Sequence, residues 1–392
     1  MAENSNIEWC THTFNPWRGC TKVSAGCKNC YADTLSARNP GTLGTWGPNG
    51  TRIVASHSMW REPLKWNNSL TYQCPSCDRK YPNVTTEGGV ECHCSSGGTV
   101  CHLLRQRVFC ASLCDVFEDW TMDLRYPAKL EEGQAWTHTI AWWNPDKGII
   151  KAGQTHAHVW HDEERLATMQ DARNQLFKLI YETPNLDWPL LTKRPENVRR
   201  MVPETWLEEG EWPHNVWIGT SVEDQNAANT RIPELLKIPA KVRFLSCEPL
   251  LGPVDLKPFT PFSVSHGVTI PQNARFWGGI DWVIAGGESG PQARPMHPRW
   301  ATSLRDQCAA AGVPFLFKQW GNFAPVSPLY APEIDEVATN GTITLEYSGC
   351  IVPEEDDQYV YQPNTSTWLM KNVGKKAAGR LLDGVEHNGY PL

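Results

Sequence analysis

The chain has 392 residues, of which 40% are hydrophobic, and a formal net charge of −7. This length and composition predict one large globular domain or two, and the acidic balance disfavours a protein that clamps a phosphate backbone through many contacts. The sequence has no apolar run of about 18 residues and no secretory pattern, which predicts no membrane span and a cytoplasmic location. In that compartment, the 14 cysteines predict metal ligands rather than disulfides.

The stretch 15–32, NPWRGCTKVSAGCKNCYA, contains three cysteines on a loop that leads into a helix-like segment at 29–38. They are Cys20, Cys27 and Cys30. Three thiolates can each bind one iron of a 4Fe-4S cube and leave the fourth iron open to a ligand that is not protein. Gly19 and Gly26 permit a tight backbone there. The alternatives are zinc, which normally takes four protein ligands, and unrelated buried thiols.

A second group of cysteines falls in an insertion at 67–106, where a C-x2-C knuckle precedes a C-x-C pair across a Gly-rich spacer. The expected ligands are Cys74, Cys77, Cys92 and Cys94, with Cys101 or His102 as substitutes. The segment has few apolar residues with which to build a core, whereas zinc held by four thiolates contributes on the order of 10 kcal/mol to folding. The pattern predicts a zinc-ribbon-like module, and a second iron-sulfur cluster is the alternative.

Short apolar runs alternate with helical patterns between 107 and 321, which is typical of parallel strands with crossover helices. The expected strands are 7–14, 108–114, 188–192, 216–220, 242–246, 282–285 and 314–318. The expected helices are 163–182, 195–202, 226–236 and 298–311. This pattern predicts an α/β fold, a partial or complete parallel (β/α) barrel whose chemistry lies at the carboxyl ends of the strands.

The insertion at 122–160 and its boundary are rich in tryptophan and histidine: Trp136, Trp142, Trp143, Trp160, His138, His156, His158 and His161. We expect a hydrophobic lid there, and base stacking or a histidine metal site are the alternatives. The expected divisions of the chain are 1–66, 67–106, 107–121, 122–160, 161–321 and 322–392. The last is a C-terminal extension with strands at 342–347 and 358–361 and a helix-like KKAAGRLLDG that covers the barrel mouth or its side.

Polar residues follow the expected strands and should gather at one rim of the barrel. We expect Ser112, Lys193, Ser221, Glu223, Gly286, Gly287 and Glu288, with Tyr31 after the last thiol, to bind a cofactor or substrate. Asp115, Glu248 and Cys247 are the candidate catalytic residues, because carboxylates can bind protons and a thiol, Cys247 or Cys114, can donate a hydrogen atom. In Gly286-Gly287-Glu288, the glycines let backbone approach a ligand and the carboxylate can accept from an ammonium, although a tight turn would read the same. The basic run Lys193, Arg194, Arg199 and Arg200 is either a binding patch or a solvated helix face.

Several stretches resemble one family. The N-terminal IEWCTHTFNPWRGCTKVSAGCKNCYA, and later LTKRPENV, VWIGTSVEDQ, RFLSCEPLLG, DWVIAGGESG and GKKAAGRLLDG, are similar to phage-associated radical SAM-like proteins of otherwise unassigned function. The resemblance implies a 4Fe-4S cluster on Cys20, Cys27 and Cys30, whose open iron binds S-adenosylmethionine, and an external electron donor whose electron yields a 5′-deoxyadenosyl radical. In that superfamily three residues separate the first two thiols and an aromatic precedes the last, whereas this chain has six residues and Asn29 at those positions.

The resemblance therefore implies a radical SAM enzyme, with an isomerase or mutase favoured over a lyase or transferase. Its phage association implies a modified DNA or nucleotide substrate whose base side chain is rearranged in the host cytoplasm. Two other classes of function remain open. One is a zinc-stabilised protein that binds nucleic acid or protein without catalysis, and the other is an electron-carrying iron-sulfur protein.

Overall fold

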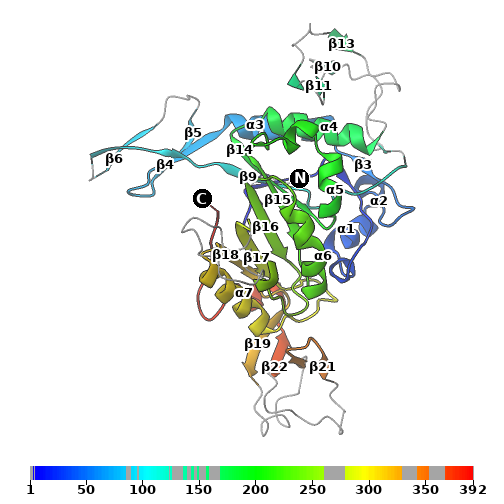
Figure 1. The fold of residues 1–392 in the computed structure, drawn as a ribbon, viewed down its shortest axis with the longest axis vertical. Helices are drawn as coiled ribbons and strands as arrows, with labels where there is room; N and C mark the ends of the chain where they lie inside the picture. The colour runs from blue at the N-terminus through cyan, green and yellow to red at the C-terminus, as the bar shows by residue number, and fades with distance from the viewer. Residues whose placement is uncertain are drawn as a thin grey trace, which may run out of the picture.

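The computed structural model describes residues 3, 5–84, 90–94, 97–122, 124–125, 136–138, 143–144, 148–149, 156–158, 168–259, 279–328, 342–352 and 367–391. Its centre is a seven-stranded sheet in the order β1-β9-β14-β15-β16-β17-β18, curled into a half-barrel (Figure 1). The strands are β1 (His12–Phe14), β9 (Gln106–Cys110), β14 (Leu186–Thr192), β15 (Val216–Ser221), β16 (Val242–Cys247), β17 (Trp282–Gly286) and β18 (Phe315–Gln319). Every neighbouring pair is parallel, so the predicted α/β class and partial barrel are confirmed.

Four helices lie beside this sheet in the connections between its strands (Figure 1). They are α4 (Met169–Tyr181), α5 (Pro195–Met201), α6 (Gln225–Leu236) and α7 (Pro298–Ala311). Helix α4 begins at a capping box, in which Thr168 and Asp171 bond each other's backbone N–H groups. Helix α7 ends at Gly312, whose left-handed conformation favours glycine. These helices match the predicted ones, except that the expected start of the first lies outside the described residues.

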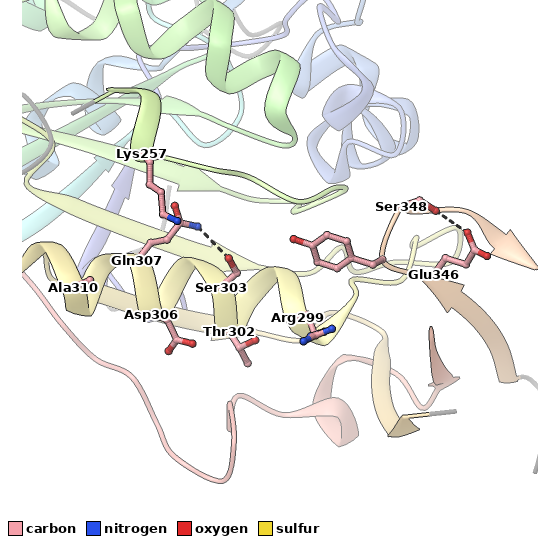
Figure 2. A pocket seen from close by; sticks show the side chains of 10 residues that line it. Lys257, Arg299, Thr302, Ser303, Asp306, Gln307, Ala310, Glu346 and Ser348 are labelled. Atoms are coloured by element: carbon pink, nitrogen blue, oxygen red, sulfur yellow. Dashed lines mark hydrogen bonds between the residues drawn. The ribbon is translucent and has the colours of Figure 1, made fainter. Parts of the chain in front are cut away.

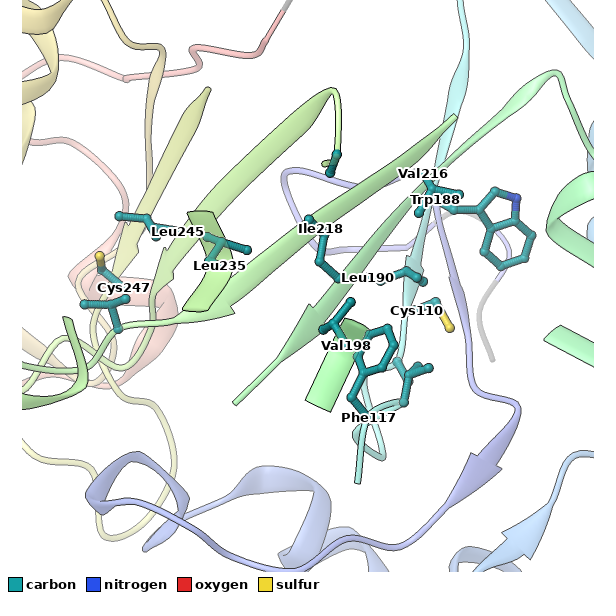
Figure 3. Close-up of a cluster of buried hydrophobic side chains, with 14 of the residues drawn as sticks. Cys110, Phe117, Trp188, Leu190, Val198, Val216, Ile218, Leu235, Leu245 and Cys247 are labelled. Carbon is teal, nitrogen blue, oxygen red and sulfur yellow. The ribbon is translucent and has the colours of Figure 1, made fainter. Parts of the chain in front are cut away.

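The sheet separates two hydrophobic cores because successive side chains of a strand point to opposite faces. Along β14, Trp188 and Leu190 pack in the outer core with the helices (Figure 3), whereas Leu191 packs against the inner core. The inner core fills the hollow of the half-barrel with large rings and consists of Trp9, Cys10, Phe109, Trp217, Phe244, Trp282, Ile284 and Leu316. Both faces are therefore buried, which accounts for the nearly continuous apolar sequence of the strands.

The C-terminal segment runs along the edge strand β18 and crosses to the opposite edge of the sheet. The backbone N–H of Phe317 donates to His387 at 3.0 Å, and that of Gly389 donates to Phe315 at 2.9 Å. Beyond them the Tyr390 hydroxyl donates to the carbonyl of Glu8 at 2.8 Å. Of the predicted terminal helix only α9 (Lys375–Ala378) forms.

The insertion at 67–106 projects from the sheet as a separate lobe (Figure 1) with its own small core around Leu70, Tyr72 and three cysteines. It contains β4 (Leu70–Gln73), β5 (Lys80–Val84), β6 (Glu91–Cys94), β7 (Gly97–Val100) and β8 (His102–Leu103). The pairs are all antiparallel, in the orders β5-β4-β8 and β6-β7. The insertion therefore contains two small antiparallel sheets, and Figure 1 shows that it extends away from the half-barrel.

The remaining elements are short. Around the N-terminal loop lie β2 (Trp17–Arg18), η1 (Ala25–Cys27), α1 (Tyr31–Arg38), α2 (Pro40–Leu43), β3 (Ile53–Val54) and α3 (His57–Asn68). Further on are η3 (Glu204–Leu207), η4 (Lys257–Phe259) and a C-terminal antiparallel sheet of β19 (Phe323–Pro328), β20 (Thr342–Glu346), β21 (Ile351–Val352) and β22 (Thr367–Asn372). The expected strand at 358–361 falls outside the described residues.

In the Trp/His-rich insertion, β10 (Trp136–His138) pairs with β13 (His156–His158), and β11 (Trp143–Asn144) pairs with β12 (Gly148–Ile149). Trp142, Trp160 and His161 lie outside the described residues, so the expected lid is not tested. Within the part of the chain that the structure describes, we find no helix with the length and hydropathy needed to span a bilayer.

Candidate functional site

A cavity of about 490 Å³ lies at the carboxyl ends of the parallel strands. All three cysteines of the N-terminal loop, Cys20, Cys27 and Cys30, line it. Of the other residues predicted for this site, the cavity is lined by Tyr31, Ser112, Asp115, Lys193, Ser221, Glu248, Gly287 and Glu288. Residues that are up to 268 positions apart in the sequence therefore meet at one rim, where a parallel barrel places its chemistry.

The loop that carries the thiols is shaped by two close backbone approaches. Gly19 has φ +105°, and a Cβ on it would overlap the carbonyl oxygen of Thr51. At Gly26 a Cβ would overlap the Glu223 carboxylate. Between them the chain forms the 3₁₀ turn η1, which ends at Cys27, and Cys30 is the N-cap residue of α1. Glycine at both positions is what lets the loop descend onto the strand ends.

Gly26→Ala should lower the free energy of unfolding by about 1–3 kcal/mol, because the added methyl group has no room beside Glu223. Gly41→Ala is the matched control in the nearby helix α2, since a Cβ there meets nothing within 4 Å. That control should be neutral or stabilising. Guanidinium denaturation of the two variants and the parent measures both values. Equal destabilisation by the two substitutions would contradict the close approach.

Burial governs the chemistry of the thiols. Burial, followed by the charges of Glu118 and Asp115, raises the pKa of the Cys20 thiol to about 12, although Arg194 lowers it. Burial also raises the pKa of Cys30. A thiol of this kind ionises readily only when a strong cationic partner compensates the buried charge, and a metal ion is such a partner.

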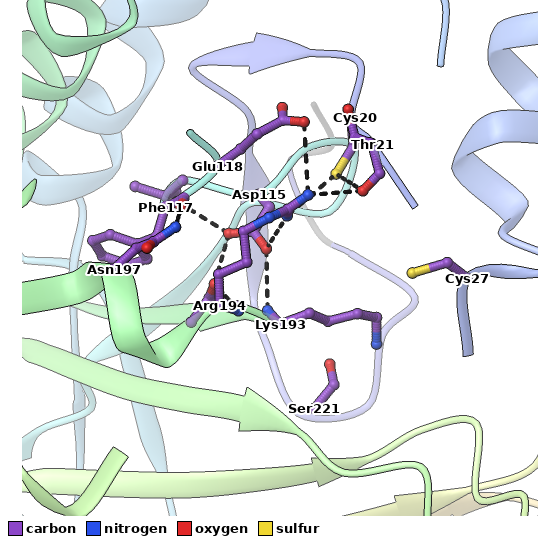
Figure 4. Close-up of polar contacts among 12 residues, drawn as sticks. Cys20, Thr21, Cys27, Asp115, Phe117, Glu118, Lys193, Arg194, Asn197 and Ser221 are labelled. Carbon is purple, nitrogen blue, oxygen red and sulfur yellow. Dashed lines mark hydrogen bonds and ion pairs between the residues drawn. The ribbon is translucent and has the colours of Figure 1, made fainter. Parts of the chain in front are cut away.

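Arg194 is the centre of a polar network behind Cys20 (Figure 4). Its Nη1 donates to Asp115 Oδ2 at 2.8 Å and to the Cys20 sulfur at 3.9 Å, and its Nη2 donates to the Thr21 carbonyl at 2.8 Å. The fully buried Arg52 binds Glu118 through two hydrogen bonds of 2.7 and 2.8 Å and donates to the Thr21 hydroxyl at 2.9 Å. Two buried arginines therefore hold the residue after the first thiol.

Asp115 does not fit the catalytic role predicted for it. One of its oxygens accepts from the Phe117 N–H and the Thr192 hydroxyl, and the other accepts from the Lys193 N–H and Arg194. Four donors occupy both oxygens, so the carboxylate has little capacity left for a substrate. Asp115 is a positioning residue for the strand end and for Arg194.

Glu223, unlike Asp115, does not line the cavity. Lys193 and Arg231 each contact one of its oxygens at 2.7 Å, and the Ser24 hydroxyl donates at 2.7 Å. Burial alone would raise its pKa, but Lys193 and Arg231 outweigh that effect and lower the pKa to about 2. Glu223 therefore stays ionised at neutral pH and ties the thiol loop to β15, which corrects its predicted contact with cofactor.

Glu288 lines the cavity, but its carboxylate is engaged by protein. Arg294 donates to it through Nε and Nη2 at 2.9 and 2.7 Å and through its backbone N–H at 2.9 Å, and Asn29 donates at 3.0 Å. The glycines before it serve packing, since a Cβ on Gly287 would overlap the Trp320 carbonyl, and Gly286 does not line the cavity. This motif anchors the thiol loop, so its predicted role as a free ammonium acceptor does not fit.

Cys247 does not reach the cavity. It is fully buried in the outer core with Leu245 (Figure 3), on the face of β16 opposite Ser246. This position does not fit the hydrogen-donor role predicted for Cys247, whereas the alternative thiol, Cys114, does line the cavity. The sequence contained a signal for this placement, because alternate residues of a strand point to opposite faces. Ser246 and Glu248 therefore face one side, and Leu245 and Cys247 face the other.

Glu248 keeps hydrogen-bonding capacity in the cavity. It pairs with Lys318 at 2.8 Å and accepts from the Ser246 hydroxyl at 3.4 Å. Across the cavity, the Tyr31 hydroxyl donates to the Ser112 carbonyl at 2.6 Å. Of the residues expected to contact a ligand, Glu248 is therefore the carboxylate with the fewest protein donors.

No role in the site was predicted for four residues that contact its carboxylates: Arg52, Arg294, Lys318 and Asn29. Arg194 was noticed only as part of a basic run that a solvated helix face explains equally well. In the structure the arginines of this run have different environments. Arg194 is only 8% exposed, whereas Arg200 binds Asp119 at the surface. Nothing in the spacing of the run separates the two, since their partners come from distant segments.

Comparison with known proteins finds one family profile that matches the chain. The profile of a family described as "Protein of unknown function (DUF5131)" matches residues 4–143 and 120–391. The chain belongs to this family. No curated protein matches the chain, and no solved structure matches it either. The family assignment spans both the thiol loop and the strand ends of this DUF5131 member.

The second candidate centre lies in the projecting lobe. The sulfurs of Cys74, Cys77, Cys92 and Cys94 all lie within 4.8 Å of one another. The Cys74 and Cys94 sulfurs are 3.9 Å apart, and those of Cys77 and Cys92 are 3.6 Å apart, too far for disulfides. Cys101 is buried beside them but is not one of the four. The group can hold a metal ion.

A larger cavity, of about 890 Å³, lies between α7 and the C-terminal sheet (Figure 2). Its lining mixes hydroxyls and charges of both signs: Lys257, Arg299, Thr302, Ser303, Asp306, Gln307, Ala310, Glu346, Tyr347 and Ser348. Within it Gln307 donates to Ser303 at 3.1 Å and Ser348 donates to Glu346 at 2.9 Å. The thiols and buried ion pairs belong to the smaller cavity, which is therefore the better candidate site.

Proposed function

We propose that this chain is a radical SAM enzyme that holds a 4Fe-4S cluster on Cys20, Cys27 and Cys30. The observation that carries the proposal is the gathering of these three thiols on one cavity at the carboxyl ends of a parallel half-barrel. Ligands of a cube bind different irons, so they need not crowd together as ligands of one ion do. Consistent with this, the group whose sulfurs converge on a single point among the described residues is the one in the lobe.

The donor set fits such a group chemically. Three soft thiolates suit an iron-sulfur cluster, and N–H groups near the sulfurs tune it. When bound with S-adenosylmethionine, the cluster supplies a one-electron reduction that generates a 5′-deoxyadenosyl radical. The chain's own task is then to position a substrate C–H bond and exclude water. Two buried rings of the inner core, Trp9 and Phe109, line the cavity, while Glu248, Lys318 and Ser221 offer polar contacts.

The proposed reaction is an isomerisation or other rearrangement of a base side chain in modified phage DNA or in a nucleotide, driven by an external electron donor. The resemblance of the sequence to phage-associated proteins supports this setting. The net charge of −7 supports recognition of a single flipped or free nucleotide over a long duplex footprint.

For the lobe we propose a structural zinc ion held by Cys74, Cys77, Cys92 and Cys94. Four thiolates in antiparallel hairpins are the usual donors of a closed, tetrahedral zinc site. The small core of the lobe supports this assignment, since it leaves metal binding as the main source of its stability.

Anaerobic reconstitution with iron and sulfide tests the enzyme. We expect about four irons per chain, a visible absorption band that bleaches on reduction, and reductive cleavage of S-adenosylmethionine to 5′-deoxyadenosine and methionine. Protein that binds zinc alone would favour a binding protein without catalysis. A cluster whose spectrum ignores S-adenosylmethionine would favour an electron carrier.

A further inference from the structure

Two arginines hold the thiol loop from different sides in similar ways. Arg194 donates to the Thr21 carbonyl at 2.8 Å and pairs with Asp115. Arg294 donates to the Ala25 carbonyl at 3.0 Å and pairs with Glu288. The two differ in one respect, because only Arg194 also contacts a thiol, the sulfur of Cys20 at 3.9 Å.

We propose that Arg194 sets the reduction potential of the cluster through its contact with Cys20. The inference rests on the proposed function. Arg194 is a positioning residue in this role, since it acts on the cluster through a ligand and touches no reacting atom. Arg294 holds the same loop through the Ala25 carbonyl and its charge is paired with Glu288, so we expect it to have little effect on the cluster.

The direction of the effect follows from charge. Reduction adds one negative charge to a cluster, and a nearby cation or an N–H donor to a cluster sulfur stabilises the reduced form. Arg194 supplies both, and its side chain is only 10% exposed, so water screens its charge weakly. Its presence therefore raises the potential and makes the cluster easier to reduce.

The neighbouring carboxylates make the arginine more important. Glu118 and Asp115 face the same sulfur, and Arg194 contacts both, at 3.7 and 2.8 Å. Arg52 neutralises Glu118 from its other side. Without Arg194, Asp115 would lose its charged partner and Cys20 would face an uncompensated negative charge. Both changes disfavour an added electron.

The test is a potentiometric titration of the reconstituted full chain without S-adenosylmethionine, with the reduced cluster followed by electron paramagnetic resonance. The variants are Arg194→Gln and Arg194→Lys, and Arg294→Gln is the matched control. We expect the midpoint to move to more negative potential in Arg194→Gln, to move less in Arg194→Lys, and to stay at the parent value in Arg294→Gln. Should Arg194→Gln fail to fold, Arg194→Met takes its place with the same expected shift, because it keeps an apolar stem and removes both the charge and the N–H donors.

An unchanged midpoint in the Arg194 variants would overturn the inference, as would equal shifts in the Arg194 and Arg294 variants, which would indicate a general loosening of the loop. These outcomes leave the proposed function intact, since the parent would still be loaded and would still cleave S-adenosylmethionine. A parent chain that binds no cluster would overturn both proposals together.

Discussion

Cys27→Ala should reduce the iron content of reconstituted protein to background and abolish cleavage of S-adenosylmethionine. The side chain is buried at the end of η1 and lines the cavity. A neighbouring polar group, the Ser24 hydroxyl at 3.8 Å from the Cys27 sulfur, is a hard donor and a poor substitute for a thiolate on iron. Loss of one of three ligands leaves two irons of the cube without protein donors. Iron and sulfide analysis, the visible spectrum and the yield of 5′-deoxyadenosine measure the effect.

Two other thiols are the controls. Cys247→Ala should keep both the cluster and the cleavage activity, because that residue lies in the outer core. The substitution should only lower the free energy of unfolding, by about 1–3 kcal/mol, because it makes a buried side chain smaller. Cluster loss in this variant, with the protein still folded, would count against the assigned ligands.

Cys114→Ala separates the enzyme from an electron carrier. Cys114 is the fourth thiol of the cavity lining, and a cube bound by four cysteines has no open iron. Under the proposed function the variant retains its cluster and still cleaves S-adenosylmethionine. Disappearance of the cluster in Cys114→Ala would instead identify a closed four-cysteine centre and would refute the radical SAM assignment.

Removal of metal from the lobe should unfold the lobe and leave the half-barrel folded. Apparent zinc-binding energies of small thiolate modules are on the order of 10 kcal/mol and appear as folding free energy, while the core of the lobe is separate from both cores of the sheet. We expect one zinc ion per chain, lost in Cys92→Ser, and rapid proteolysis confined to 67–106 after loss. Metal analysis and mapping of the cleavage sites measure both effects.

Cys101→Ser is the matched control for the lobe, because Cys101 is buried beside the four thiols but is not one of the converging group. It should keep the zinc ion and the resistance to proteolysis. Zinc loss in this variant equal to that in Cys92→Ser would show that Cys101 is a ligand. Iron found in place of zinc would revive the second-cluster alternative.

Local pattern was enough to locate the elements that carry the site. The strands from β14 to β18 and helices α5, α6 and α7 were predicted to within two residues, whereas β1 begins five residues later than predicted and β9 ends four residues earlier. Buried parallel strands have nearly continuous apolar sequences, and the helices between them begin and end at recognisable residues. The thiol loop and the C-x2-C knuckle were also visible, because each is a local spacing. The four converging cysteines of the lobe were chosen correctly from its cysteines and histidines.

The sequence did not reveal which carboxylates are already bound by other residues of the chain. Asp115 was predicted to be catalytic and Glu223 and Glu288 to bind a ligand, yet each is engaged by an arginine or a lysine of the chain. A sequence shows that a carboxylate follows a strand, but not which groups bind it. Some partners are close in sequence, since Arg231 lies 8 residues from Glu223 and Arg294 lies 6 residues from Glu288. Others come from a neighbouring strand end or from the N-terminal loop, up to 259 positions away.

The sequence by itself determined the class of fold, the strand ends at which polar residues gather, and the two groups of thiols, because these depend on periodicity and short-range spacing. The tertiary structure alone decided which polar groups form hydrogen bonds that hold the thiol loop and which can still bind a ligand. In the folded protein Glu248 keeps hydrogen-bonding capacity in the cavity, Cys247 lies on the opposite face of its strand, and Arg194 contacts Cys20. The physical reason is that a buried charge takes the nearest available partner in space, and proximity in space is fixed only when the sheet has formed.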